Sequence, residues 1–168
     1  SAKKCEVCLK TAFFMRHRLL EAMKKTLPSF QVEKGCGAEL DECFFAESFK
    51  GNHKNSELKI PRRARRRSQA TDSYEKICIL TGINDAGDMF YEIAGRNALT
   101  KDDAIAILAG KLAQGTIIST DRSHVYPAVL KALNVGRHIA SAGKEHGINK
   151  VNNLHRNLKE FIGRFHGV

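Results

Sequence analysis

The 168-residue sequence predicts an α/β fold in which a mixed β-sheet is flanked by helices. Short apolar, β-rich runs recur along the chain, segments with helical spacing lie between and after them, and the turn "NDAG" joins two of the runs. The hydrophobic fraction of 42% is typical of a domain with its own core. Because no apolar run has the length of a membrane span and no signal peptide is visible, we expect no membrane association and a cytoplasmic location.

The first predicted element is a helix within "KTAFFMRHRLLEAMKK". Apolar residues recur there at spacings of three and four, at Ala12, Met15, Leu19 and Met23. We therefore expect an N-terminal helical segment over residues 1–30, followed by a core domain over residues 35–168. The chain has no starting Met and ends inside a periodic pattern, so we expect a fragment whose core is truncated at its C-terminus.

The remaining elements alternate between strands and helices. Strands are predicted by β-rich runs at residues 38–45, 76–83, 88–96, 116–120 and 135–141. Helices are predicted over residues 100–115, 123–133 and from about 150 onward. This order is that of a ribonuclease-H-like sheet, in which the first and fourth strands lie side by side. Asp41 in the first strand and Asp121 after the fourth would then meet, although 79 residues separate them.

The first strand carries unexpected acids. "AELDECFFAE" has four acids in ten residues, and Asp41 is followed directly by Glu42. A carboxylate in a half-buried strand is costly unless a cation or a metal ion accompanies it. Two converging carboxylates suit Mg²⁺, and a pair of such ions can promote phosphoryl transfer. The alternative is that Asp41 pairs with a nearby Arg and that Asp121 only caps the helix that follows it.

The charge of the chain predicts a polyanionic partner. Lys and Arg outnumber Asp and Glu by 28 to 18. Residues 50–67, called here the basic segment, have no periodicity and contain one acid and eight basic residues: Lys50, Lys54, Lys59, Arg62, Arg63, Arg65, Arg66 and Arg67. We expect them to contact DNA phosphates without identifying bases. A solvated surface loop is the alternative.

Several ordered motifs together resemble a known family. "ELDECFFAESFKGNHK", "RRARRR", "LTGINDAG", "EIAGR", "STDRSHVY" and "VNNLHRNLKEFIGRFHGV" are similar to the catalytic core of bacterial insertion-sequence transposases of the DDE superfamily, in the ISXO-two-like group. The resemblance covers about residues 11–168. It implies a ribonuclease-H-like fold, with the first helix a short remnant of a helix-turn-helix that packs and contacts DNA through Arg16 and Arg18.

The resemblance also implies an activity and its partners. In that family the matching aspartates are metal-binding catalytic residues, which gives Asp41 and Asp121 this role with two Mg²⁺ or Mn²⁺ ions. The expected reaction is cleavage and strand transfer of double-stranded DNA, comprising transposon ends and target, in the bacterial nucleoid. A homo-oligomer is expected on DNA. A ribonuclease-H-like nuclease without strand transfer and a catalytically dead, DNA-binding transposase remnant are the alternatives.

The sequence leaves the identity of the third metal-site residue open. The superfamily usually has Glu on the last helix, but related branches have Asn, which matches Asn152. Asn offers a neutral oxygen and cannot act as a base. Glu145 or Glu160 could complete the site instead. Of the seven histidines, His124 is the one that we expect near Asp121.

Two further groups complete the predicted site. Arg156 and Lys159 share a helix face with Asn152 and His155, so we expect this face to meet DNA phosphate. Glu42 is expected to be an auxiliary acid beside the metal ions.

Overall fold

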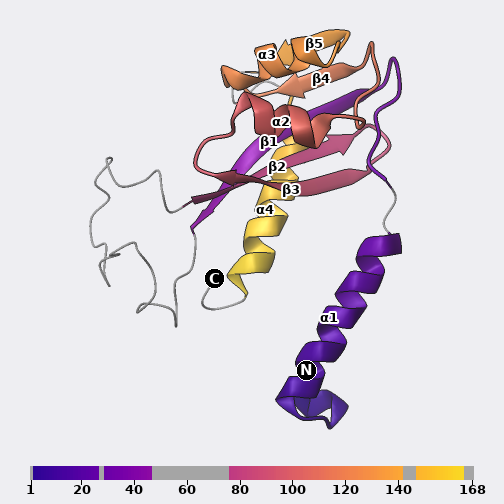
Figure 1. The fold of residues 1–168 in the computed structure, drawn as a ribbon, viewed down its shortest axis with the longest axis vertical. Helices are drawn as coiled ribbons and strands as arrows, with labels where there is room; N and C mark the ends of the chain where they lie inside the picture. The colour runs from indigo at the N-terminus through magenta and orange to yellow at the C-terminus, as the bar shows by residue number, and fades with distance from the viewer. Residues whose placement is uncertain (1, 27–28, 47–75, 142–146, 165–168) are drawn as a thin grey trace, which may run out of the picture.

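The structure, a computed structural model, describes residues 2–26, 29–46, 76–141 and 147–164 (Figure 1). Two of the predictions from the sequence lie outside these ranges. They are the whole basic segment and the alternative third residue, Glu145.

A five-stranded mixed sheet forms the centre of the molecule, with strand order β3-β2-β1-β4-β5. The strands are β1 (Gly37–Ala46), β2 (Lys76–Asn84), β3 (Met89–Arg96), β4 (Ile117–Thr120) and β5 (Arg137–Ala140). Strand β1 is antiparallel to β2 and parallel to β4, and β4 is parallel to β5. The predicted α/β class and the predicted adjacency of the first and fourth strands are therefore confirmed.

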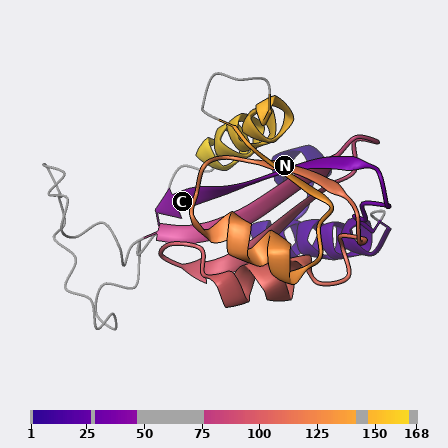
Figure 2. The same cartoon turned by 90° about the horizontal axis from the view of Figure 1, so that it is seen from above.

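Helices cover both faces of this sheet. They are α2 (Lys101–Leu108), α3 (Val125–Ala132) and α4 (Asn149–Gly163). Figure 2 shows α4 on one side of the sheet and α2 and α3 on the other. The Thr100 side chain caps α2 by accepting the Asp103 N–H. The helix stops seven residues earlier than residue 115, because Ala109 leaves the helical region and Gly110 turns with φ +76°.

Successive side chains along each strand point to opposite faces of the sheet, so each face has its own set of residues. Leu40, Leu80 and Ile118 point toward α2 and α3 and are fully buried in the core, together with Tyr126 and Val129 of α3. Side chains one position further along β1 and β2 point to the α4 face. At its start, β1 therefore presents Leu40 to α2 and α3 and the acids Glu39 and Asp41 to α4.

The loop before β4 and the turn after α3 pass very close to each other. A Cβ atom at Gly136 would lie 2.7 Å from the Cα of Gly115, so only glycine fits at position 136. The Gly136 and Arg137 N–H groups both donate to the Thr116 carbonyl, each at 3.0 Å. This contact fixes where β4 and β5 begin.

Helix α1 (Leu9–Thr26) follows a short 3₁₀ turn, η1 (Ala2–Cys5), and stands apart from the sheet in Figure 1. The predicted helix is confirmed, but the expectation that it packs is wrong, because none of its residues is buried. Phe13, Leu19 and Met23 are all more than half exposed. Within the described ranges, no helix combines the length and the apolar character that crossing a membrane requires.

Candidate metal centre

The structure brings together three carboxyl groups, from Asp41, Glu42 and Asp121. One oxygen of each lies within 4.8 Å of the others. The parallel pairing of β1 with β4 causes this meeting, because the register that aligns Glu39 with Ser119 continues toward Asp41 and Asp121. Strand β4 ends at Thr120, so Asp121 lies just beyond the end of the sheet ladder.

The two neighbouring acids of β1 reach this cluster from opposite faces of the sheet. Glu42 points toward α3, where the buried Tyr126 hydroxyl donates to its Oε2 at 2.5 Å. The Asp41 side chain points toward α4, and its Oδ1 accepts the Glu42 N–H at 2.9 Å. Asp121 Oδ1 accepts the Ser123 N–H at 2.9 Å, so it also caps the turn that leads into α3. Asp121 does not cap α3 itself, because the N-cap residue is His124 and no side chain makes the cap hydrogen bond.

Burial and mutual repulsion make the cluster electrostatically strained. Burial, then the charges of Glu42 and Asp121, raise the pKa of Asp41 to about 7. Burial also raises the pKa of Glu42, an effect that the Tyr126 hydrogen bond partly offsets. Lys159 acts in the opposite direction and lowers the pKa of Asp41. Without a cation, the three acids cannot all be charged at neutral pH without cost.

Helix α4 contributes a residue that the sequence analysis did not place near the aspartates. His155 Nδ1 lies 3.6 Å from Asp41 Oδ2. This contact is not a pair of opposite charges at neutral pH, because burial and the neighbouring Lys159 lower the pKa of His155 to about 4. The signal in the sequence was the helical spacing: His155 is four residues after Val151 and next to Leu154, both buried.

The other predicted site residues on α4, and His124 before α3, are exposed. Asn152 is exposed in the first turn of α4 and, among the described residues, has no side-chain hydrogen bond. Glu160 is exposed and pairs with Arg164 at 2.7 Å. Arg156 is exposed, and His124 is exposed but near enough to lower the pKa of Glu42. Among residues 147–164, His155 thus lies beside Asp41, and Lys159 is near enough to lower the pKa of Asp41.

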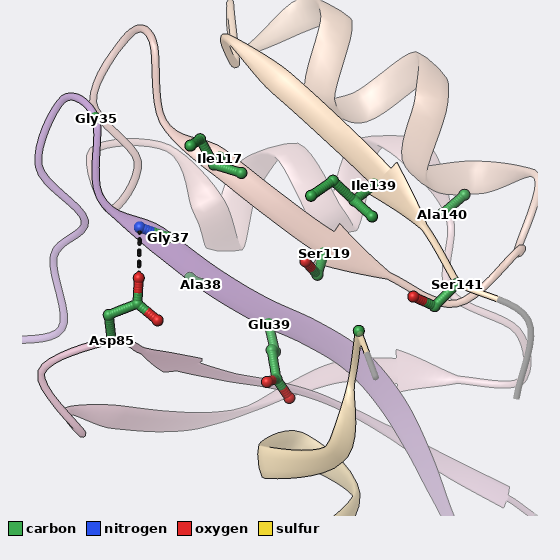
Figure 3. Close-up of a pocket in the computed structure, with 11 residues that line it drawn as sticks. Gly35, Gly37, Ala38, Glu39, Asp85, Ile117, Ser119, Ile139, Ala140 and Ser141 are labelled. Carbon is green, nitrogen blue, oxygen red and sulfur yellow. Dashed lines mark hydrogen bonds between the residues drawn. The ribbon is translucent and has the colours of Figure 1, made fainter. Parts of the chain in front are cut away.

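A groove of about 510 Å³ is lined by the start of β1, by β4 and by the end of β5 (Figure 3). The two carboxylates that line the groove, those of Glu39 and Asp85, already bind other groups of the protein. Glu39 accepts the Val151 N–H at 3.0 Å, and Asp85 accepts the Gly37 N–H at 3.0 Å and pairs with Lys150 at 3.1 Å. The groove does not include Asp41 or Asp121. Its contacts instead hold the first turn of α4 against β1.

The donor set of the acidic cluster fits a divalent cation. Carboxylate oxygens are the ligands that Mg²⁺ and Mn²⁺ take in proteins, and a cation would offset the burial and the mutual repulsion that raise the pKa of Asp41. No protein-family model matches this chain, and no curated protein matches its sequence. The function is therefore inferred from this geometry and from the motifs of the sequence.

Proposed function

We propose that this chain is the catalytic core of a DDE-type transposase, with a ribonuclease-H-like sheet, that cuts DNA strands and joins the freed 3′-hydroxyl to a target. The observation that carries the proposal is the meeting of Asp41 and Asp121 from adjacent parallel strands, with Glu42 beside them. The motifs quoted above support it, because their aspartates are these two residues. The strand order is compatible with such a sheet.

Each side chain of the cluster has a defined task in this proposal. Asp41 and Asp121 hold the divalent ions, Mg²⁺ or Mn²⁺, and Glu42 supports them while Tyr126 fixes its carboxylate. When bound, the ions activate a water or a 3′-hydroxyl and stabilise the leaving oxygen of the displacement. Lys159, close enough to affect the charge of Asp41, is placed to attract a DNA phosphate. Asn152 remains our proposed third residue, at the solvent-exposed edge of the site.

DNA is the partner that the charge of the chain supports. The net charge is +10, and the basic segment follows β1, the strand that carries two of the acids. We propose that the basic segment and Arg156 contact the phosphate backbone. Such contacts fix the position of the duplex and supply affinity without reading its sequence. The proposed assembly on DNA is a homo-oligomer.

The decisive experiment compares the wild type with the double variant Asp41→Asn, Asp121→Asn. A pre-cut DNA end and a target plasmid are incubated with each protein in Mn²⁺, and joined products are separated from cleaved ones. We expect joining by the wild type and none by the double variant, because both ionic ligands are lost. Asp102→Asn, which neutralises an exposed acid of α2, is the matched control and should act like the wild type.

The possible outcomes separate the alternatives. Cleavage without joining would identify a nuclease of the same fold. DNA binding with no Mn²⁺-dependent reaction, unchanged in the double variant, would identify a DNA-binding remnant and contradict the proposal. DNA affinity in EDTA should stay equal or rise in the double variant, because two repelling charges are removed.

A further inference from the structure

His155 belongs to a buried network that includes the backbone of Asp41. Its side chain is on α4, only 6% of the residue is exposed, and its Nε2 lies 2.5 Å from the Thr81 Oγ1 of β2. Thr81 is fully buried, pairs with Asp41 in the β1–β2 ladder, and donates its hydroxyl proton to the Asp41 carbonyl at 2.9 Å. The imidazole is therefore held in place by a strand and not by solvent.

These two hydrogen bonds determine where His155 carries its proton. The Thr81 hydroxyl has one proton, and the Asp41 carbonyl can only accept. Both bonds exist together only if His155 Nε2 is protonated and donates to Thr81 Oγ1. Nδ1 then carries a lone pair. Among the described residues it makes no hydrogen bond, and it faces Asp41 Oδ2 at 3.6 Å.

Two lone pairs that face each other repel, and a metal ion between them, or a proton on Asp41 in the metal-free protein, would remove that repulsion. Ligand atoms 3.6 Å apart, each roughly 2.1 Å from a shared ion, would subtend about 120° at that ion, nearer to the angle of a tetrahedral site than to the right angle of an octahedral one. We propose that His155 Nδ1 is a direct nitrogen ligand of the ion that Asp41 binds, so that the centre prefers divalent transition ions such as Mn²⁺ and Co²⁺ over Mg²⁺. This inference rests on the metal site of the proposed function.

The expected preference for Mn²⁺ and Co²⁺ over Mg²⁺ follows from the chemistry of the ligands. Mg²⁺ is bound almost entirely through oxygen, whereas first-row transition ions gain affinity from imidazole nitrogen, Co²⁺ more than Mn²⁺. The ring is also pre-positioned. Val151, one helical turn before His155, donates its N–H to Glu39, which is two residues before Asp41 on the same face of β1. Helix α4 is thus attached to the strand beside the ligand pair.

Titration calorimetry on the metal-free 168-residue chain tests the preference with MgCl₂, MnCl₂ and CoCl₂. We expect the wild type to bind Mn²⁺ and Co²⁺ on the order of tenfold or more tighter than Mg²⁺, and His155→Ala to lose most of that difference with little change for Mg²⁺. His138→Ala is the matched control, because His138 Nε2 also contacts a buried threonine, Thr120, at 2.8 Å. It should keep the preference. An unchanged ratio of affinities in His155→Ala would overturn the inference.

Pulsed electron paramagnetic resonance of Mn²⁺ bound to the wild type tests the same point without a variant. A directly bound imidazole gives a ¹⁴N coupling, which we expect, and its absence would refute nitrogen ligation even if His155→Ala fails to fold. If the wild type binds no divalent ion, the proposed function and this inference both fail. If it binds Mg²⁺ and Mn²⁺ alike without a ¹⁴N coupling, the carboxylate site stands and only the inference fails.

Discussion

The Asp41→Asn variant should make the metal-free protein more stable at alkaline pH. Asn keeps the size of the side chain, and its oxygen can still accept the Glu42 N–H that Asp41 Oδ1 accepts at 2.9 Å. Its amide nitrogen can donate toward His155 Nδ1, which now lies 3.6 Å from a carboxylate oxygen. The substitution therefore removes a buried charge and provides a donor where two acceptors face each other.

The raised pKa of Asp41 sets the size and the pH range of this effect. The folded protein binds the proton of the Asp41 carboxyl more tightly than the unfolded chain, whose Asp pKa is near 3.8. The contribution of Asp41 to the free energy of unfolding is therefore largest at low pH, and it falls as pH rises from about 4 to about 7, where the folded group titrates. Three pKa units at 1.36 kcal/mol each set an upper limit of about 4 kcal/mol. Because three acids share the repulsion, we take about 2 kcal/mol, or about 4–8 °C in Tm.

The assay is a thermal melt in EDTA from pH 5 to pH 9, followed by far-ultraviolet circular dichroism. The Tm advantage of Asp41→Asn should be smallest at pH 5 and largest at pH 8 and above. Asp102→Asn, the exposed control, should follow the wild type throughout. If Asp41→Asn and the wild type have equal Tm values at all pH values, the cluster is not strained as the structure indicates, and the reasoning from burial and repulsion is wrong.

Three further predictions concern Tyr126, Gly136 and the basic segment. Tyr126→Phe removes the 2.5 Å hydrogen bond to Glu42 from a fully buried ring and should lower the unfolding free energy by about 1–2 kcal/mol in urea titrations; an unchanged midpoint would contradict the contact. Gly136→Ala places a Cβ 2.7 Å from Gly115 and should cost roughly 1–3 kcal/mol or more, whereas Gly163→Ala, with open space around it, should cost nothing by the same measurement. Replacing the five Arg residues of the basic segment by Gln should flatten the slope of log affinity for DNA against log salt by several units, at about 0.9 per lost phosphate contact; an unchanged slope would show that the segment does not contact DNA.

The arrangement of the sheet could be predicted because its signals are local and regular. The β2–β3 hairpin was marked by two β-rich runs around a short Asn/Asp/Gly turn, and β4 by an apolar run that ends in Asp121. Each strand was found within a few residues. The end of α2 was missed because Lys111 and Leu112 continue an apolar-polar pattern past Gly110, where the backbone turns away.

The composition of the site could be predicted only in part. Asp41 and Asp121 follow from strand order, which fixes neighbours across long sequence distances. His155 and Tyr126 do not follow, because their roles depend on the rotation of α4 and α3 about their axes, which a hydrophobic stripe defines only coarsely. His155 is four residues after Val151 and three before Leu158, so it borders the hydrophobic stripe of α4, and this position was the signal in the sequence that it faces the sheet.

The parallel pairing of β1 with β4 has a consequence for how this protein is made. Seventy-nine residues lie between Asp41 and Asp121, and β2, β3 and α2 must all be synthesised before β4 can lie beside β1. A nascent chain that ends before β4 holds Asp41 and Glu42 without the acid that completes the cluster. Long-range parallel pairing is also a slow event in folding. The ability to capture a metal ion therefore arises late, and in a folding experiment metal uptake would mark the completion of the sheet and not its beginning.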